Sequence, residues 1–475
     1  MLSASPESVF KGEPFVRTTP RRLVTAVAAA SILALLSACG GSPDPGGSTD
    51  PGAGDQGSAE TSSGSTQGPA DGWTGGDVTV TLWHDNAAIQ PAVDLFNEAH
   101  AEQGIQIEFT ETTDLVQAVR NAVTAGTGPD AFVTQTADLA SFISEGTAAD
   151  ITDYYGPLAP LYSDVVNDAV TTGGRQWAVP AAQIPTFMIY NADIWTEKGL
   201  EYPTTYEDFL EAGKTLAADG ISIFNIAGED PTTFIYMAWE AGARWYELDG
   251  DSWTIDIDSD ETRRTAEYFD AGLEAGIFSK ISYAEYAAMM QAYNDGQIAT
   301  RQLSTWQTKG MQANLTTGLG AWDPQPNLEW ADNGPANAAF TRVFAVNSAS
   351  ENIDAAVYAT SWLSTNAASI EALGDPEAGL SWFPAVADAT PYIGASLPEQ
   401  LVGEHADNWQ PVVENAVATQ KGDWTYGPNW AGAFLQLQDL WGKAVAGQIK
   451  TVDIAPALQQ WVVEDLKAQG INVTE

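Results

Sequence analysis

Two spacings of apolar residues alternate along the chain between residues 78 and 133. Apolar residues that alternate with polar ones predict a half-buried strand, and apolar residues three or four positions apart predict an amphipathic helix. The strand positions are Val78, Val80 and Leu82, then Ile105, Ile107 and Phe109, then the short run 131–133; the helix positions are Ile89, Val93 and Phe96, then Leu115, Val119, Ala122 and Val123. Gly104 and Gly126 follow the two helical stretches and mark their ends.

Strands that alternate with helices form parallel sheets through right-handed crossovers, so we predict an α/β fold. Ligands of such sheets bind beyond the carboxyl ends of the strands. Those ends carry Trp83, His84 and Asp85 after the first predicted strand and Gln135 after the third. We therefore expect a binding site at this edge of the sheet.

The composition of the chain changes near residue 77. Residues 40–76 consist mainly of Gly, Ser, Pro, Asp and Thr, and such a segment buries too little apolar surface to offset the entropy cost of folding. We predict a disordered stalk over residues 39–76, which as a Gly-rich coil would span about 30–35 Å. The stretch from 77 to 475 contains no second linker and is long enough for two domains of ordinary size.

The first 38 residues are typical of a secretory signal peptide. Basic residues, including Arg21 and Arg22, precede an apolar run at 23–36 that is too short to span a bilayer. Residues 36–39, Leu-Ser-Ala-Cys, resemble the lipobox of bacterial lipoproteins, which implies that Cys39 is lipidated and becomes the new N-terminus. The mature protein is then expected at the extracellular face of the cell membrane, held by its lipid alone. The arginine pair leaves the general and the twin-arginine export routes both open.

Residue counts exclude several classes of function. Cys39 is the only cysteine, so no thiol remains for a metal site or a nucleophile once it is lipidated. The three histidines, His84, His100 and His405, are far apart and belong to no HxxxH, HxH or GxSxG motif. A net charge of −44 repels nucleic acid phosphates. We therefore expect no catalytic residue, no metal, no cofactor and no nucleic-acid partner.

One acidic stretch imitates a calcium-binding loop. Four acidic residues stand at positions 1, 3, 5 and 12 of an EF-hand pattern; they are Asp256, Asp258, Asp260 and Glu267. Glu261 occupies the position that requires glycine, and Arg263 would bring positive charge close to an ion. We predict instead a strand over 253–257, followed by a helix capped at Ser259 or Asp260.

Seven segments between residues 80 and 363 match one known family in order and spacing. They are Val-Thr-Leu-Trp-His at 80–84, Gly-Pro-Asp-Ala-Phe at 128–132, and the segments 177–180, 189–195, 203–209, 294–306 and 344–363. The set resembles the extracellular solute-binding proteins of ABC importers, in the maltose/oligosaccharide class. The resemblance implies an α/β fold of two lobes, the type II periplasmic-binding-protein-like fold, with the ligand in a cleft between lobes joined by a multi-crossing hinge. The implied N-lobe is 77–183 and 340–387, the implied C-lobe is 184–339 and 388–475, and the hinges lie near 183–185, 339–341 and 389–391.

The aromatic content independently favours a carbohydrate ligand. The chain has 17 tryptophans, and sugars present apolar C–H faces to aromatic rings and hydroxyls to polar groups. Trp306 matches the position of a sugar platform in the family, and the fork-shaped side chain of Arg342 suits adjacent hydroxyls. The expected ligand-binding residues are Trp83, Asp85, Gln135, Gln183, Asp230, Trp306, Arg342, Trp382 and Trp430. Four other tryptophans, spaced within helical apolar patterns, are expected in the core: Trp195, Trp362, Trp441 and Trp461.

These features predict a lipid-anchored, monomeric solute-binding protein that captures a carbohydrate, either a disaccharide or an oligosaccharide. It would deliver that ligand to the permease subunits of an ABC transporter without chemistry of its own. Two alternatives stay open at this point. A lipid-anchored glycoside hydrolase or other sugar-active enzyme would also suit aromatic clefts and abundant carboxylates. An adhesive or signalling lipoprotein would instead bind a protein partner. The sequence does not identify the sugar, its length or its linkage.

Overall fold

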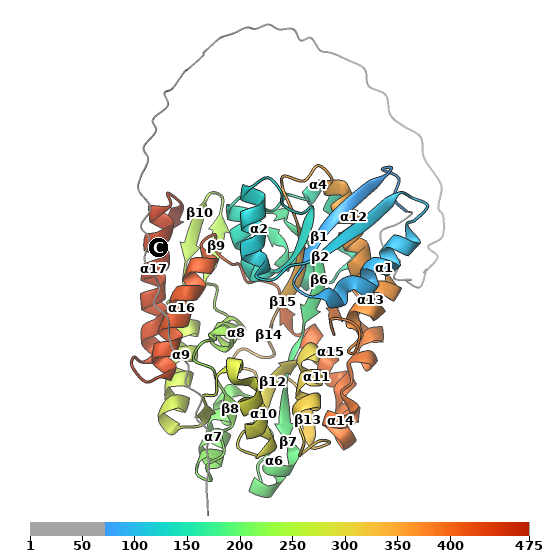
Figure 1. Cartoon of the computed structure of the whole chain (residues 1–475). Helices are drawn as coiled ribbons and strands as arrows, with labels where there is room; N and C mark the ends of the chain where they lie inside the picture. The colour runs from blue at the N-terminus through green and yellow to red at the C-terminus, as the bar shows by residue number, and fades with distance from the viewer. Residues whose placement is uncertain (1–71, 475) are drawn as a thin grey trace, which may run out of the picture. The chain divides into compact units, whose positions relative to one another are not determined.

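The computed structural model describes residues 72–474 (Figure 1). The predicted signal peptide, the lipidation site Cys39 and most of the predicted stalk lie outside this range. Trp73, near the end of the predicted stalk, packs against the folded part, with its ring centroid 5.6 Å from that of Tyr358. Its backbone N–H donates to Gln103 Oε1 at 2.7 Å. Among the described helices, none has the length and apolar character needed to cross a membrane.

A six-stranded sheet forms the centre of the first lobe. Its strand order is β16-β6-β15-β3-β1-β2, and the bounds in that order are Phe383–Pro384, Ala178–Ile184, Phe340–Val346, Ala131–Gln135, Val78–His84 and Ile105–Glu111. β1 pairs in parallel with both β2 and β3. Helices α1 (Gln90–Ala99) and α2 (Leu115–Thr124) connect these strands. The predicted alternation of strands and helices over 78–133 is therefore confirmed.

The sheet is mixed rather than wholly parallel as predicted. β15 runs antiparallel to its neighbours β3 and β6. β6 carries the chain out of the first lobe, because only Pro185 separates it from β7 (Thr186–Asn191) in another sheet. β15 carries the chain back, so it runs in the opposite direction beside β6. The apolar pattern at 78–133 lacks both strands and could not indicate this.

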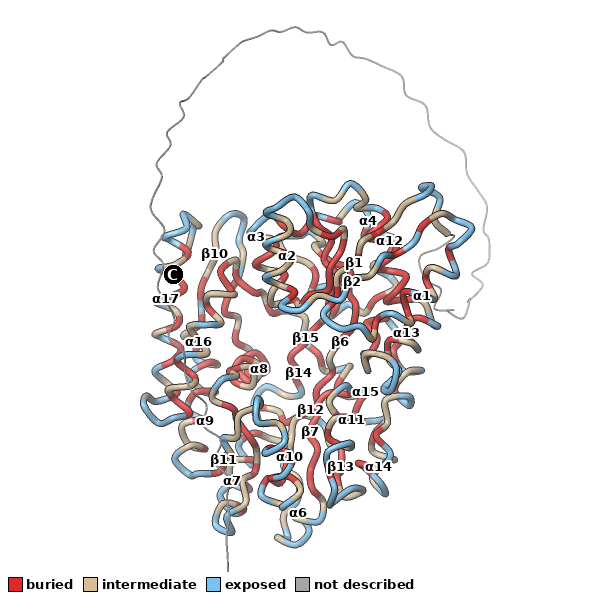
Figure 2. The backbone as a smooth tube through the Cα atoms, in the orientation of Figure 1, coloured by how far each residue is buried: buried red, intermediate tan, exposed pale blue. Residues whose placement is uncertain are grey.

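Helices cover the faces of the six-stranded sheet, in which β3, β6, β15 and β16 are buried along most of their length (Figure 2). The remaining elements of the first lobe are α3 (Thr136–Ser144), α4 (Thr152–Tyr155), α5 (Asp164–Ala169), β4 (Thr171–Thr172), β5 (Arg175–Gln176), α12 (Ile353–Thr365) and α13 (Ala367–Gly374). Phe96, Phe132, Phe344 and Leu363 belong to one buried cluster that joins these helices to the sheet. That cluster contains residues from 80–181 and from 343–385, so two distant parts of the sequence share one core.

The second lobe is mainly helical and is organised around the antiparallel sheet β12-β7-β13. Its strands are β7, β8 (Phe224–Asn225), β9 (Tyr246–Asp249), β10 (Ser252–Ile255), β11 (Phe278–Ser279), β12 (Thr300–Ser304), β13 (Trp322–Gln325), β14 (Asn337–Ala338), β17 (Gln420–Lys421) and β18 (Asn472–Thr474). Its helices are α6 (Ala192–Lys198), α7 (Tyr206–Ala217), α8 (Thr232–Glu240), α9 (Asp260–Ala275), α10 (Tyr286–Asn294), α11 (Thr305–Asn314), α14 (Glu399–Val402), α15 (Trp409–Ala418), α16 (Trp430–Val445) and α17 (Ile454–Ala468). Trp195 and Trp441 are buried in its core, as predicted.

The acidic stretch at 256–267 follows a strand and begins a capped helix, as predicted, although the strand spans 252–255 rather than 253–257. β10 ends at Ile255, and the hydroxyl of Ser259 caps α9 by accepting a hydrogen bond from the backbone N–H of Thr262 at 3.2 Å. Arg263 donates to both carboxylate oxygens of Asp258, at 2.9 and 2.8 Å. The stretch therefore contains the start of a helix, capped by Ser259, and an ion pair between Asp258 and Arg263.

Candidate functional site

A cavity of about 360 Å³, here called the central cavity, lies where several chain segments meet. It is lined by the end of β1, the end of β6, the start of β15, the start of α11 and the loop before β16. Six of the nine predicted ligand-binding residues line it: Asp85, Gln135, Gln183, Trp306, Arg342 and Trp382. The structure therefore brings together residues that are far apart in sequence. Asp85 and Trp382, for example, are 297 positions apart.

Asp85 and Arg342 form an ion pair on the wall of this cavity. Nη2 of Arg342 donates to both carboxylate oxygens of Asp85, at 2.9 and 2.8 Å. Burial alone would raise the pKa of the Asp85 carboxyl, but the charge and hydrogen bonds of Arg342 outweigh burial and hold that pKa below its ordinary value. Nε of Arg342 is buried and has no hydrogen-bond partner within residues 72–474. The guanidinium thus keeps one donor unused.

His84, the residue before Asp85, contributes a second unused donor. Its side chain is fully buried, and its Nδ1 accepts a hydrogen bond from the backbone N–H of Asn86 at 2.9 Å. Burial lowers the pKa of His84 to about 4, so the ring is neutral at pH 7 and carries its proton on Nε2. In the part of the chain that the structure describes, this Nε2 has no hydrogen-bond partner.

Gln183 supplies an unused acceptor at the end of β6. Its Nε2 donates to the backbone carbonyl of Pro384 at 2.7 Å, which fixes the orientation of the amide. Its Oε1 is buried and finds no partner among the described residues. Leaving a buried polar atom unpaired costs about 1–3 kcal/mol. Three such atoms therefore occur in residues that line one cavity, within the described part of the chain.

Aromatic side chains complete the walls of the central cavity. Trp306 lies in the first turn of α11, in the second lobe, and is 51% exposed. Trp382 precedes β16 in the first lobe, with its ring 6.0 Å from the guanidinium carbon of Arg342 and 5.5 Å from the ring of His84. Phe340, at the start of β15, is a third aromatic residue of the lining. The two lobes therefore present aromatic and polar groups to the same space.

Three predicted ligand-binding residues lie apart from the central cavity. Trp83 is partly buried and packs against the core of the first lobe. The carboxylate of Asp230 accepts a hydrogen bond from the backbone N–H of Thr232 at the start of α8, which is a capping contact. Trp430 is only 4% exposed, because Trp245, Tyr246 and Tyr426 surround its ring. None of the three belongs to the lining of the central cavity.

Sequence reasoning did not select some residues that the structure places in the lining. His84 is named in the sequence analysis only as part of a strand end, although its position directly before Asp85 could have suggested it. Ser381 adopts a positive φ of 54°, which is unusual for a residue other than glycine. No sequence pattern marks that conformation. Phe340 follows the crossing between the lobes, where the pattern gives no indication of which side chain faces inward.

A family model of bacterial extracellular solute-binding proteins matches residues 82–370, more than half of the chain. The diacetylchitobiose binding protein DasA of Streptomyces coelicolor is 22% identical over 308 residues, which cover 64% of this chain and 64% of DasA. The maltotriose-binding protein of Pyrococcus abyssi is 25% identical over 201 residues, 41% of this chain and 43% of its own. The chain thus covers less than two thirds of the length of either relative.

A solved structure shows the same fold. The galacto-N-biose-/lacto-N-biose I-binding protein of the ABC transporter from Bifidobacterium longum, in complex with lacto-N-biose, superposes with a TM-score of 0.73 at 22% identity, covering 84% of this chain and 100% of that one. The fold is therefore the two-lobe, type II fold of periplasmic binding proteins, as the sequence predicted. Together with the match over residues 82–370, this shows that the chain belongs to the bacterial extracellular solute-binding proteins.

Proposed function

We propose that this protein is a lipid-anchored extracellular solute-binding protein that captures a disaccharide or an oligosaccharide and delivers it to an ABC transporter permease. The observation that carries the proposal is the combination of unpaired buried polar atoms in His84, Gln183 and Arg342 with the exposed ring of Trp306 in one cavity. Sugar hydroxyls both donate and accept hydrogen bonds, so a sugar could satisfy all three atoms. Its apolar face suits the indole ring.

The names of the relatives support the carbohydrate class. DasA binds diacetylchitobiose, the Pyrococcus protein binds maltotriose, and the Bifidobacterium protein was solved with lacto-N-biose. These sugars differ in composition and linkage, so they support the class of ligand rather than one sugar. The Bifidobacterium protein belongs to an ABC transporter, which supports an ABC permease as the partner.

Binding would close the two lobes around the ligand. The chain passes between the sheets at Pro185 and at Ala339, and these are two of the hinge positions that we propose. A ligand that touches Trp306 in one lobe and Arg342 in the other favours the closed state, because it gains both sets of contacts only there. We propose that the N-lobe comprises 77–183 and 340–387, and that the C-lobe comprises 184–339 and 388–475.

The cavity gives little support to a glycoside hydrolase. Such enzymes place two carboxyl groups on opposite sides of the scissile bond. Among the described residues, Asp85 is the one acidic side chain in the lining of the central cavity, and it is paired with Arg342. A bound sugar should therefore be recovered intact after long incubation, and new reducing ends that disappear in Asp85→Asn would establish hydrolysis instead.

A melting-temperature screen tests the proposal. Diacetylchitobiose, maltotriose, lacto-N-biose and their shorter and longer homologues provide the panel. At a ligand concentration 100-fold above Kd, binding stabilises the folded state by about 2.7 kcal/mol, which raises the melting temperature measurably. A panel without any such rise would contradict a carbohydrate ligand. Loss of membrane attachment in Cys39→Ala, with the protein released into the medium, would support the lipid anchor.

A further inference from the structure

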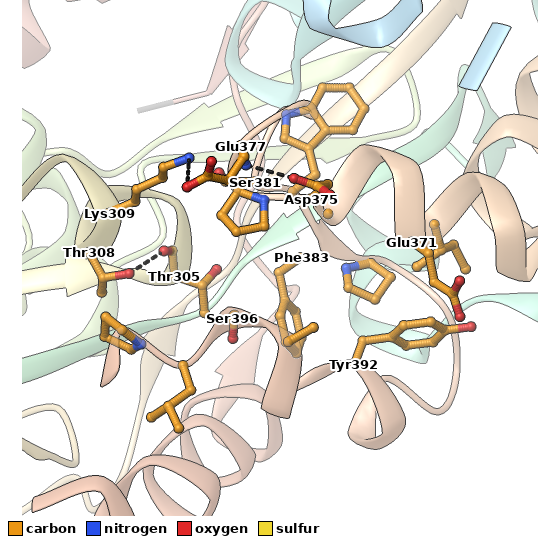
Figure 3. Close-up of a pocket in the computed structure, with 18 of the residues that line it drawn as sticks. Thr305, Thr308, Lys309, Glu371, Asp375, Glu377, Ser381, Phe383, Tyr392 and Ser396 are labelled. Carbon is orange, nitrogen blue, oxygen red and sulfur yellow. Dashed lines mark hydrogen bonds and ion pairs between the residues drawn. The ribbon is translucent and has the colours of Figure 1, made fainter. Parts of the chain in front are cut away.

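A second cavity adjoins the central one. This side cavity, of about 260 Å³, lies between α11, α13 and the segment 392–398 (Figure 3). It shares Thr305, Ser381, Trp382 and Phe383 with the central cavity. Figure 3 shows Thr305 and Thr308 on one side of the space and Glu371 and Tyr392 on the other, with Phe383 between them.

A third cavity adjoins the central one at its other end. It measures about 460 Å³, lies at the start of α2, and shares Asp85, Gln135 and Arg342 with the central cavity. The ion pair between Asp85 and Arg342 stands at this boundary. No aromatic residue occurs in the lining of this α2 cavity as far as the described residues go.

The side cavity has the chemistry that suits a sugar unit. It offers aromatic carbon from Trp382 and Tyr392 beside the hydroxyl and charged groups of Ser381, Lys309 and Glu371. Sugar rings pair apolar C–H faces with hydroxyls, so they need both kinds of group. The α2 cavity adds the aliphatic side chains of Leu115, Val116 and Val133 to its polar groups but, among the described residues, offers no aromatic ring. A saccharide chain that leaves the central cavity therefore finds better contacts toward α13 than toward α2.

The loop between α13 and β16, which lines both the central cavity and the side cavity, is held in one conformation. The backbone N–H groups of Leu380 and Trp382 both donate to the carbonyl of Leu373, at 2.9 and 3.2 Å. Asp375 accepts hydrogen bonds from the backbone N–H groups of Glu377 and Ala378, at 2.7 and 2.9 Å. A site that is already formed loses little entropy when a ligand binds. The positive φ of Ser381, which lines both cavities, is a strained feature of the kind that concentrates at functional sites.

An ion pair connects the lobes across the side cavity. Nζ of Lys309, on α11, lies 3.8 Å from a carboxylate oxygen of Glu377, in the loop after α13. The side cavity is thus bounded by both lobes, as the central cavity is. A sugar unit there would contribute to the same lobe closure as the units in the central cavity.

We propose that the ligand is an oligosaccharide whose chain extends from the central cavity into the side cavity, and not into the α2 cavity. This inference rests on the proposed carbohydrate function and adds the direction and minimum extent of the bound chain. Adding a sugar unit beyond those that the central cavity holds should lower Kd by about tenfold or more, equivalent to 1.4 kcal/mol per decade.

The test is calorimetric titration of a homologous sugar series, from monosaccharide to tetrasaccharide, with the unmodified protein and two variants. Ala395→Phe fills the side cavity from an exposed position in its wall. Gln117→Trp is the matched control, since it fills the α2 cavity from an exposed position on α2. Ala395→Phe should remove the gain from the additional unit and leave the affinity for shorter sugars unchanged. Gln117→Trp should retain that gain.

Different outcomes overturn different statements. Equal affinity for all chain lengths in the unmodified protein would overturn this inference and leave the proposed function intact. A gain that Gln117→Trp removes and Ala395→Phe retains would show that the chain extends toward α2 instead. Failure of every sugar to bind would overturn the proposed function and the inference together. Melting curves check that each variant is folded, and Ser396→Tyr, from the same wall, replaces Ala395→Phe if that variant does not fold.

Discussion

Nη2 of Arg342 contacts both carboxylate oxygens of Asp85, at 2.9 and 2.8 Å, and so joins β15 to the loop after β1. The two residues are 257 positions apart in sequence. β15 returns the chain from the second lobe, so the pair is formed only when the return crossing is in place. It fixes the guanidinium of a residue that lines the central cavity, and the Nε of this guanidinium has no partner among the described residues.

The first prediction concerns this pair. Arg342→Gln should weaken sugar binding by about 10- to 150-fold, the equivalent of the 1.5–3 kcal/mol that a hydrogen bond to a charged group contributes. Arg263→Gln is the control, because Arg263 makes a similar two-oxygen contact with Asp258 on the surface. Titration calorimetry on both variants should show the loss in Arg342→Gln alone. Equal affinities would mean that Arg342 only positions Asp85.

Trp306 and Trp430 should respond to truncation in opposite ways. Trp306 is 51% exposed, so Trp306→Ala should cost about 2–4 kcal/mol of binding, or about 30- to 700-fold in Kd, with little loss of stability. Trp430 is 4% exposed, so Trp430→Ala should cost about 3–5 kcal/mol of unfolding free energy. Calorimetry and urea unfolding on both variants separate the two effects. A large stability loss with unchanged affinity in Trp306→Ala would place Trp306 among the structural tryptophans.

The buried imidazole of His84 makes stability depend on pH. Burial lowers its pKa from 6.5 to about 4, so the unfolded chain binds a proton in a range where the folded protein does not. Stability is therefore fully present above about pH 6.5 and falls as the pH decreases toward about 4. Between pH 7 and pH 5 this group should account for a loss on the order of 2 kcal/mol.

Urea unfolding at pH 7 and pH 5 measures this loss. His84→Gln should have a smaller pH dependence than the unmodified protein, whereas His405→Gln, outside the central cavity, should retain the contribution of His84. An unchanged pH dependence in His84→Gln would show that the histidine ring is hydrated in the unliganded protein.

Glu240 makes stability depend on pH in the opposite direction. Its carboxyl is buried on α8 and accepts hydrogen bonds from Tyr206 at 2.6 Å and Asn327 at 2.9 Å, yet burial raises its pKa to about 8. The folded protein thus retains a proton that the unfolded chain releases above its ordinary pKa of 4.5. The stabilising effect of that proton is complete below about pH 4.5 and is lost as the pH rises to about 8.

Glu240→Gln removes this titration and keeps one of the two acceptor oxygens, so it can still accept the hydrogen bond from Asn327. The stability of Glu240→Gln relative to the unmodified protein should therefore rise between pH 5 and pH 8, as measured by urea unfolding. The surface change Glu285→Gln is the control. A difference that stays constant with pH would mean that Glu240 titrates as an ordinary carboxyl.

Apolar spacing was enough to predict the secondary structure of the first part of the chain. Val80 and Leu82 are buried in β1, and Val93 and Phe96 are buried in α1, as the two periods predicted. Asp85 and Gln135, expected at the carboxyl ends of the first and third strands, both line the central cavity. These features depend on local spacing, which a single sequence displays.

Other features depend on contacts between distant segments. Trp430 was expected among the ligand-binding residues, but Trp245 and Tyr246 pack against it from another part of the second lobe. His84 accepts a hydrogen bond from the Asn86 backbone at Nδ1, while its Nε2 has no partner within residues 72–474, and the sequence does not display this geometry. The side cavity arises from α11 and α13, which lie in different lobes, so no local pattern indicates it.

Titration calorimetry of the unmodified protein with the saccharide panel tests the central claim most directly. The account predicts saturable heat with one ligand per protein for at least one saccharide, and a 30- to 700-fold weaker Kd, about 2–4 kcal/mol, in Trp306→Ala. A protein that is folded by its melting curve and gives no saturable heat with any saccharide would contradict carbohydrate capture in the central cavity.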